Sequence, residues 1–254
     1  MESLIPILKD IDSFLWGVPL ITLLVGTGIL LTVRLSLIQV LHLPRALSLI
    51  LHAKNRGAGD ISSFKALCVA LAATIGTGNI VGVATAVKVG GPGAIFWMWM
   101  AAFFGMATKY AEGLLAVKYR TTDAHGEIAG GPMYYIRRGM GERYRPLAGF
   151  FAAATVLVAF FGIGTFPQVN AIVDSVELSF GIPRIGTDLL LTLLIAAITI
   201  GGLRSIAEVA SRIIPFMAVL YVVISAGVIF VHAGEVPAAL ALILDSAFTG
   251  AAAA

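Results

Sequence analysis

Long apolar runs separated by short polar stretches dominate the pattern along this chain. Each run is about 20 residues long, which is the length that an α-helix needs to cross the hydrocarbon core of a bilayer. Six such runs are complete and a seventh begins near the end of the chain. We therefore predict transmembrane helices over residues 13–33, 66–87, 90–117, 147–173, 187–203 and 211–231, with the start of a seventh at 236–254.

The second run carries polar and flexible residues at its centre. Residues 76–79 read GTGN inside the apolar stretch 66–87. Because hydrocarbon cannot satisfy loose backbone groups, a weakened helix at that depth is stable only where it faces protein or a water-filled cavity. A broken span near the bilayer midplane is the usual construction of a transporter's substrate site. The pattern predicts a break in this span with a binding site beside it.

The fourth run contains a second disturbance, residues 162–170 (GIGTFPQVN). Pro167 removes a backbone donor, and Gln168 and Asn170 are costly in lipid, so both amides should face protein or a cavity. Two interpretations of Gln168 stay open, a substrate contact or a hydrogen bond that joins helices. Asp245 in the last run is a functional candidate by its depth, unless a helix break exposes it to water.

Composition and charge agree with a membrane protein. The chain is 59% apolar and 12% charged, whereas soluble domains carry about 25% charged residues. The basic residues gather in the loops 34–65 and 118–146, so the positive-inside rule predicts that these loops are cytoplasmic and that the N-terminus lies outside. The basic balance therefore indicates a bilayer and not a nucleic acid. The first residues lack the basic stretch of a cleaved signal peptide, so we expect the first span to remain in the mature protein.

Several single residues and one short segment lead to further local predictions. The single cysteine, Cys68, excludes an intrachain disulfide and a multi-cysteine metal site, and we interpret it as a packing residue. Lys109 and Glu112 are spaced i,i+3 and could pair on one helix face, or snorkel toward the inner surface. Trp16, Trp97 and Trp99 fall toward the outer ends of their spans and could anchor at the membrane interface or pack in the core. Residues 126–141 join apolar aromatics to arginines, which predicts a short interfacial helix.

Three sequence blocks resemble those of one transporter family. They are residues 74–82 (TIGTGNIVG), 90–105 (GGPGAIFWMWMAAFFG) and 130–136 (GGPMYYI). In this order they are similar to the signatures of the alanine/glycine:cation symporter family, the sodium:alanine symporters. The resemblance runs from the first span to the end of the chain.

The resemblance implies an all-α membrane protein, a helical bundle of the leucine-transporter type. In that fold two inverted five-helix repeats surround a site at the bilayer midplane. The first span would be one extra N-terminal helix, spans two to six would be the first repeat, and residue 236 would open a truncated second repeat. A full member of the family should have about twice as many core spans.

The resemblance also implies the activity, a secondary active symporter in the bacterial inner membrane. It would couple the entry of a sodium ion to the uptake of a small neutral amino acid, alanine or glycine, by alternating access, with no organic cofactor. Freed amides and a positive helix end at the break suit the substrate carboxylate. The substrate-binding candidates are Thr77, Gly78, Asn79, Gly164 and Gln168.

Carbonyl oxygens released from the first half-helix suit Na⁺, a hard cation. By position in the resembling fold, Ala72 and Ile75 would serve one sodium site, and Thr74 and Asn79 would serve another.

Two alternative functions and an enzymatic role are weaker. A cation channel would favour a loop of repeated filter residues, and the chain has none of the TVGYG kind. A truncated, non-transporting membrane fragment is compatible with the missing second repeat. An enzyme is not expected, because the four histidines lie in loops or at span ends and no HExxH or GxSxG pattern occurs.

Overall fold

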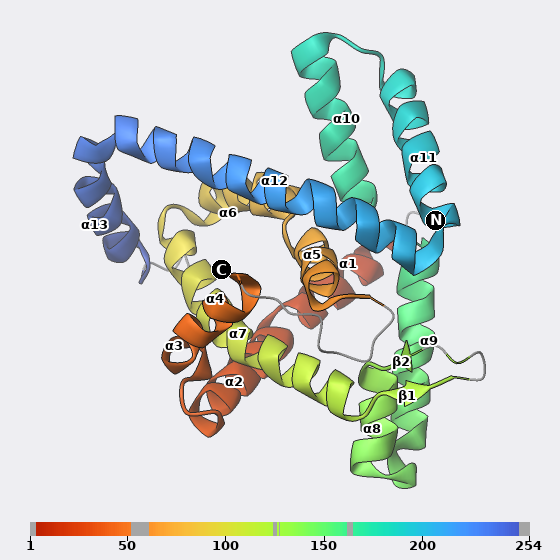
Figure 1. The fold of residues 1–254 in the computed structure, drawn as a ribbon. Coiled ribbons are helices and arrows are strands. Elements are labelled where there is room, and N and C mark those ends of the chain that lie inside the picture. The colour runs from red at the N-terminus through yellow and green to blue at the C-terminus, as the bar shows by residue number, and fades with distance from the viewer. Residues whose placement is uncertain (1–3, 52–60, 124–125, 127, 162–164, 249–254) are drawn as a thin grey trace.

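The computed structural model describes residues 4–51, 61–123, 126, 128–161 and 165–248, which are helical almost throughout (Figure 1). In chain order the elements are α1 (Leu4–Trp16), α2 (Val18–Arg34), α3 (Ile38–Leu41), α4 (Leu43–Leu51), α5 (Ser63–Thr74), the 3₁₀ turn η1 (Thr77–Asn79), α6 (Val81–Gly90), α7 (Gly93–Lys118), β1 (Thr121–Thr122), β2 (Ile128–Ala129), α8 (Pro132–Met140), the 3₁₀ turn η2 (Glu142–Tyr144), α9 (Arg145–Phe161), α10 (Phe166–Phe180), α11 (Arg184–Ile200), α12 (Gly202–Val231), the 3₁₀ turn η3 (Ala233–Glu235) and α13 (Val236–Ser246).

The helices agree in part with the predicted spans. By length and composition, Ile5–Arg34, Glu142–Phe180 and Gly202–Val231 could each cross a membrane, and the second of these runs over residues 162–164, which are not described. The bent pair Ser63–Thr74 and Thr77–Gly90 adds a fourth span if it is counted as one. The predicted all-α class is thus confirmed. The spans over α7, α11 and α13, and the arrangement in inverted repeats, stay predictions.

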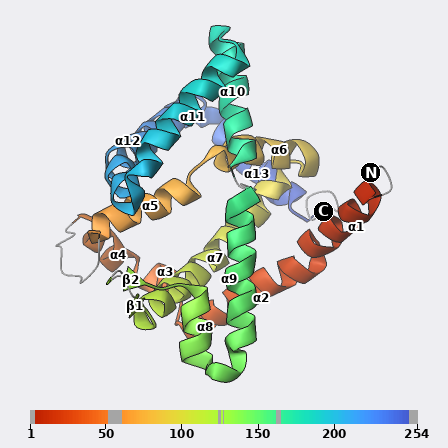
Figure 2. The ribbon, with the colours of Figure 1, turned by 90° about the vertical axis from the view of Figure 1, so that its right-hand side faces the viewer.

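Two helical hairpins extend from opposite ends of the fold. Helices α10 and α11 form one, and α8 with α9 forms the other, next to the short β1–β2 hairpin (Figures 1 and 2). In that hairpin Thr121 lies opposite Ala129 and Thr122 opposite Ile128 in an antiparallel pair. Between these ends α5 packs along the long helix α12, and α2 packs along α7. The break after α5 therefore lies in the central part of the molecule.

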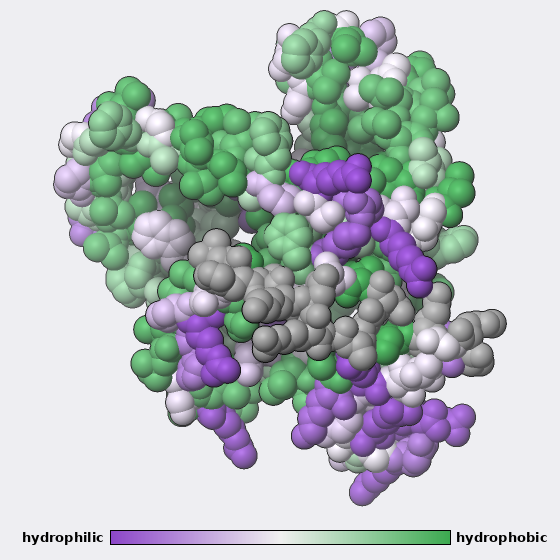
Figure 3. All heavy atoms as spheres, in the orientation of Figure 1, coloured by the Kyte–Doolittle hydropathy of each residue, from purple (hydrophilic) through white to green (hydrophobic). Residues whose placement is uncertain are grey.

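The buried core is small for a chain this apolar. Cys68 on α5 is 1% exposed and packs with Ala210 and Ile214 on α12, which confirms its interpretation as a packing residue. Many large apolar side chains are exposed, and apolar side chains cover much of the face in Figure 3. The hydrophilic side chains of this face gather over α8, over the first part of α12 and over the region of α3 and α4. A soluble monomer rarely shows so large an apolar surface, and this surface agrees with a membrane protein.

The α7–α8 region confirms two local predictions. Lys109 Nζ lies 2.9 Å from Glu112 Oε2, so the i,i+3 pair forms. Helix α8 forms within the predicted segment 126–141, although its position at a membrane interface stays a prediction. Burial raises the pKa of the Tyr135 phenol above its ordinary value, the Glu112 carboxylate adds to this rise, and Lys109 opposes it.

The end of the described chain folds back onto α7. The Trp97 indole Nε1 donates a hydrogen bond to the Ala247 carbonyl at 2.6 Å, and the rings of Phe96, Trp97 and Phe248 contact one another. This contact favours the packing interpretation of Trp97 over interface anchoring. Asp245, one of the last residues of α13, is exposed.

Candidate functional site

The predicted break in the second apolar run is confirmed. Helix α5 ends at Thr74 because the next two residues are extended: Ile75 has φ −91° and ψ 104°, and Gly76 has φ −148° and ψ −166°. The chain then forms the turn η1 and continues as α6, and the helix axis bends by 56° across the break. The polar GTGN sequence thus occupies the junction of two half-helices.

Asn79 stabilises the start of the second half-helix. The Gly76 amide donates to Asn79 Oδ1 at 3.1 Å, and the Asn79 amide donates back to the Gly76 carbonyl at 3.0 Å. These reciprocal bonds close a short turn and satisfy two of the amides that every helix start leaves open. Thr77 and Gly78 lie between the two bonded residues, at the first two positions of η1.

The same bonds divert two amides from the end of α5. In a continuous α-helix the Gly76 amide would donate to the Ala72 carbonyl, and the Asn79 amide would donate to the Ile75 carbonyl. Both amides have other partners here. The two carbonyls that lose these amide donors, those of Ala72 and Ile75, are the ones assigned above to one sodium site. Thr74, a candidate for the second sodium site, has its side chain in a hydrogen bond: its hydroxyl donates to the Ala70 carbonyl of its own helix at 2.6 Å.

The second disturbed region lies against the break. Helix α10 begins at Phe166 with Pro167 in its first turn, where the missing amide has no helical partner to lose. The described part of the disturbance, from Thr165 onward, is therefore the start of α10. Gln168 lies in this first turn and packs against Gly76, whose hypothetical Cβ would be 3.6 Å from Gln168 Nε2.

The structure thus brings together most of the predicted binding residues. Thr77 is half-buried, and Gly78, Asn79 and Gln168 are exposed. A Cβ on Gly78 would meet no atom of the described residues within 4 Å, so open space adjoins the turn. Gly164, the remaining substrate candidate, lies outside the described residues.

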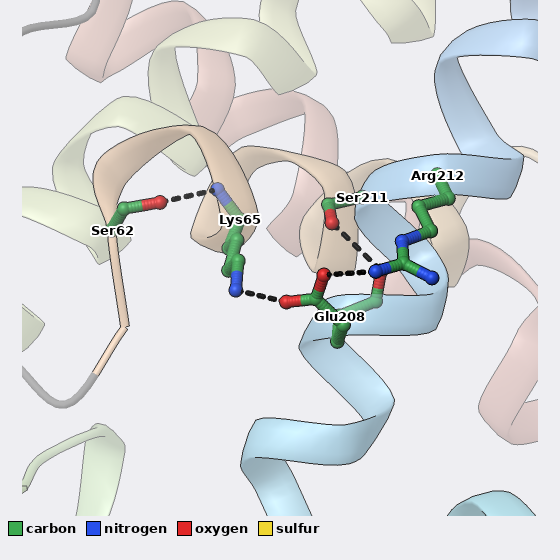
Figure 4. Close-up of polar contacts among 5 residues, drawn as sticks. All are labelled: Ser62, Lys65, Glu208, Ser211 and Arg212. Atoms are coloured by element: carbon green, nitrogen blue, oxygen red, sulfur yellow. Dashed lines mark hydrogen bonds and ion pairs between the residues drawn. The ribbon is translucent and has the colours of Figure 1, made fainter.

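Sequence reasoning missed an ion-pair cluster at the other end of α5 (Figure 4). Helix α5 starts at its cap Ser62, whose Oγ accepts from the Lys65 amide at 3.3 Å. The Lys65 ammonium pairs with one oxygen of Glu208 on α12, and Arg212 Nη2 donates to the other oxygen at 2.9 Å. The cluster was missed because Lys65 and Glu208 are 143 residues apart, and no local spacing predicts their contact.

Cavities also occur between α2 and α7. One measures about 330 Å³ and includes Lys109 and Glu112 in its lining, and a larger apolar groove measures about 950 Å³ and reaches Phe248. Both are lined by α2 and α7 side chains and not by the break, so they are separate from the candidate site. The apolar walls of the larger groove suit hydrocarbon better than a zwitterion.

The comparisons with known proteins agree on one family. Residues 1–254 match the model of the sodium:alanine symporter family. An uncharacterized transporter of Haemophilus influenzae is 60% identical over 242 residues, which are 95% of this chain and 53% of that protein. The sodium/alanine symporter AgcS of Methanococcus maripaludis is 47% identical, over 96% of this chain and 54% of that protein. A probable sodium/glutamine symporter, GlnT of Bacillus subtilis, is 37% identical, over 98% of this chain and 51% of that protein. The chain thus spans about half the length of the curated relatives it matches.

Proposed function

Because this chain belongs to the sodium:alanine symporter family, we propose that it supplies the substrate site and part of the sodium site of a secondary active symporter. The symporter couples sodium entry to the uptake of a small neutral amino acid, alanine or glycine. The observation that carries the proposal is the break between α5 and α6, with Gln168 packed against it. The activity is proposed for the full-length gene product, since the curated relatives are about twice as long.

The substrate carboxylate binds at the start of the second half-helix in this proposal. Thr77 and Gly78 are the first residues of η1, where amides have no partner within a helix and the helix dipole is positive. The open space beside Gly78 gives a small zwitterion access to these amides. The Gln168 amide group, next to Gly76, is within reach of the other end of such a ligand.

The sodium ion binds to the end of the first half-helix. The carbonyls of Ala72 and Ile75 are oriented by α5 and by the extended link, and the amides that would occupy them bond elsewhere. Oxygen ligands of this kind suit a hard cation. For the second group, Thr74 and Asn79, both side-chain oxygens already take part in hydrogen bonds within the break region, and each retains a lone pair for a cation.

Coupling then follows from a shared structural element. Sodium orders the carbonyl end of α5 and the amino acid orders the start of η1, and one extended link joins the two. Each ligand therefore favours the ordered break and raises the affinity for the other, and this coupling is reciprocal. Alternating access of the ordered site to the two sides of the membrane completes uptake.

The ion pair between α5 and α12 supports the proposed topology. It joins Lys65 to Glu208, near the N-terminal ends of both helices. Lys65 ends the loop 34–65, which the positive-inside rule assigns to the cytoplasm. Glu208 lies between the predicted spans 187–203 and 211–231, and their link falls on the same side because successive spans alternate in direction. A multi-pass protein in the bacterial inner membrane, with the N-terminus outside and loops 34–65 and 118–146 inside, satisfies both observations.

Reciprocal coupling gives the test. The full-length protein in proteoliposomes should take up labelled alanine down an inward sodium gradient, and sodium should lower the alanine concentration for half-maximal uptake. Raising alanine should lower the half-saturating sodium concentration by the same factor, if both are measured as equilibrium binding. Equal uptake in sodium and choline, or single-channel sodium currents without alanine, would contradict the proposal. Competition by glycine and by glutamine then ranks the substrates by size.

A further inference from the structure

Helix α5 is a separate short rod within the fold. Its N-terminal end is fixed by the Ser62 cap, and its C-terminal end is the extended link at Ile75 and Gly76. A rod that ends in a non-helical link can change its tilt through a few backbone dihedrals. The position of its carbonyl end therefore depends on what holds the rest of the rod in place.

Helix α12 holds that rod by packing and by charge. Cys68, which is 1% exposed, fills the contact with Ala210 and Ile214. One turn before Cys68, Lys65 reaches across to Glu208. The Glu208 carboxylate is itself held on α12 by Arg212, four residues along the same helix (Figure 4). One carboxylate thus joins a cation of its own helix to a cation of the neighbouring helix.

A small tilt of α5 displaces its end by more than metal–oxygen distances tolerate. Ten residues separate Lys65 from Ile75, which is roughly 15 Å of helix. A tilt of about 10° moves one end of such a rod by about 2–3 Å relative to the other. Metal–oxygen distances tolerate deviations of only about 0.2 Å. A contact that fixes the tilt of α5 therefore decides whether its carbonyls can meet a cation.

We infer that Glu208 is a positioning residue: by bridging Arg212 and Lys65 it holds α5 against α12 and sets where the Ala72 and Ile75 carbonyls lie. The consequence for transport rests on the proposed symport. The attachment of α5 to α12 does not rest on the proposed symport, because it is visible in the packing of Cys68. The attachment and the effect on transport can therefore be measured separately.

Cys68 provides the first measurement, since it is the single cysteine of this chain and lies in the α5–α12 contact. Alkylation by N-ethylmaleimide is followed in membranes of the full-length protein by mass spectrometry of the peptide that contains Cys68. Lys65→Met and Glu208→Gln should each raise the alkylation rate about two- to fivefold, the effect of losing a half-exposed ion pair. The double variant should add little to either change.

Two controls make this measurement specific. Lys65→Arg keeps the charge and should restore the wild-type rate, which a merely misfolded variant would not do. Glu112→Gln breaks the pair with Lys109 inside α7, a lysine–carboxylate contact that joins no second helix, and should leave Cys68 unchanged. Alkylation of Lys65→Met and Glu208→Gln at the wild-type rate would overturn the inference.

Sodium dependence of uptake provides the second measurement. In Lys65→Met and Glu208→Gln the half-saturating sodium concentration should rise about two- to fivefold, more than the maximal rate falls. Faster alkylation of Cys68 with an unchanged half-saturating sodium concentration would overturn the positioning role. Faster alkylation in a protein whose wild type shows no sodium-dependent uptake would contradict the proposed symport and leave the attachment of α5 by Glu208 standing.

Discussion

Gln168 lies against Gly76: a Cβ on Gly76 would be 3.6 Å from Gln168 Nε2 and 3.7 Å from Cδ. The glycine belongs to the break after α5 and the glutamine to the first turn of α10, so two interruptions of separate apolar runs meet at one point. A Cβ at residue 76 would thus be in van der Waals contact with the Gln168 amide group. This contact places the Gln168 amide beside the break, where it can act on a ligand bound there.

Replacing Gln168 by Ala should reduce sodium-stimulated alanine uptake at least tenfold. The reason is the loss of a side-chain hydrogen bond to a charged ligand, worth about 1.5–3 kcal/mol. Uptake into proteoliposomes with matched amounts of protein measures the effect. Asn170→Ala removes an amide two residues along the same helix, where the chain points to another face, and should retain more than half of the uptake. Equal losses in both variants would show that α10 had been disturbed and that Gln168 has no special role.

Substitutions at Gly78 should separate folding from binding. No atom of the described residues lies within 4 Å of a Cβ on Gly78, so the first side-chain atom of Gly78→Leu has open space around it. We expect normal expression and an unchanged melting temperature, but loss of uptake, because the leucine side chain fills the space proposed for the substrate. Gly82 on α6 also has no atom within 4 Å of its hypothetical Cβ. Gly82→Leu is therefore the matched control and should transport normally. Uptake by Gly78→Leu at the wild-type rate would remove the substrate from this side of the break.

Asn79 should contribute to stability apart from any ligand. Asn79→Ala removes the acceptor of the Gly76 amide, and losing such a cap costs about 1 kcal/mol. The free energy of unfolding should fall by that amount, which lowers the melting temperature by about 2–4 °C in a chain of this size. Asn79→Asp keeps an acceptor oxygen and should melt like the wild type. Thermal melting in detergent, followed by circular dichroism without sodium or alanine, measures this effect, and equal melting of the Ala and wild-type proteins would contradict it.

Features encoded within a few residues could be predicted from the sequence. The break follows from the GTGN sequence inside an apolar run, and the Lys109–Glu112 pair follows from helical spacing. The packing role of Cys68 follows from its type and surroundings. In each case the physical cause is local, whether a flexible backbone, an i,i+3 geometry or a small apolar side chain.

Contacts between distant segments could not be predicted in this way. Nothing near Gly76 signals that Gln168 will pack on it, and nothing near Lys65 signals Glu208. The form of the predicted disturbance in the fourth run could not be predicted for another reason. The run is apolar on both sides of the disturbance, and Pro167 fits the first turn of a helix as well as a kink within one. Tertiary packing decides such cases.

The α2–α7 contact should depend on the absence of a side chain at Gly28. A Cβ there would lie 2.8 Å from Phe104 Cβ and 3.0 Å from the Phe104 carbonyl oxygen, closer than real contacts allow. Close backbone approach at small residues is a common basis of helix packing in membranes. Gly28→Ala should therefore force the two helices apart and lower the free energy of unfolding by about 1–3 kcal/mol.

Gly26 provides the matched control, two residues earlier on the same helix. A Cβ on Gly26 would meet no described atom within 4 Å. Because alanine favours a helix over glycine by about 0.5–1 kcal/mol, Gly26→Ala should melt at or above the wild-type temperature, while Gly28→Ala melts several degrees below it. Detergent melts of the two variants measured side by side decide the matter. If both variants gained stability, α2 and α7 could not approach as closely as Gly28 and Phe104 do in this structure.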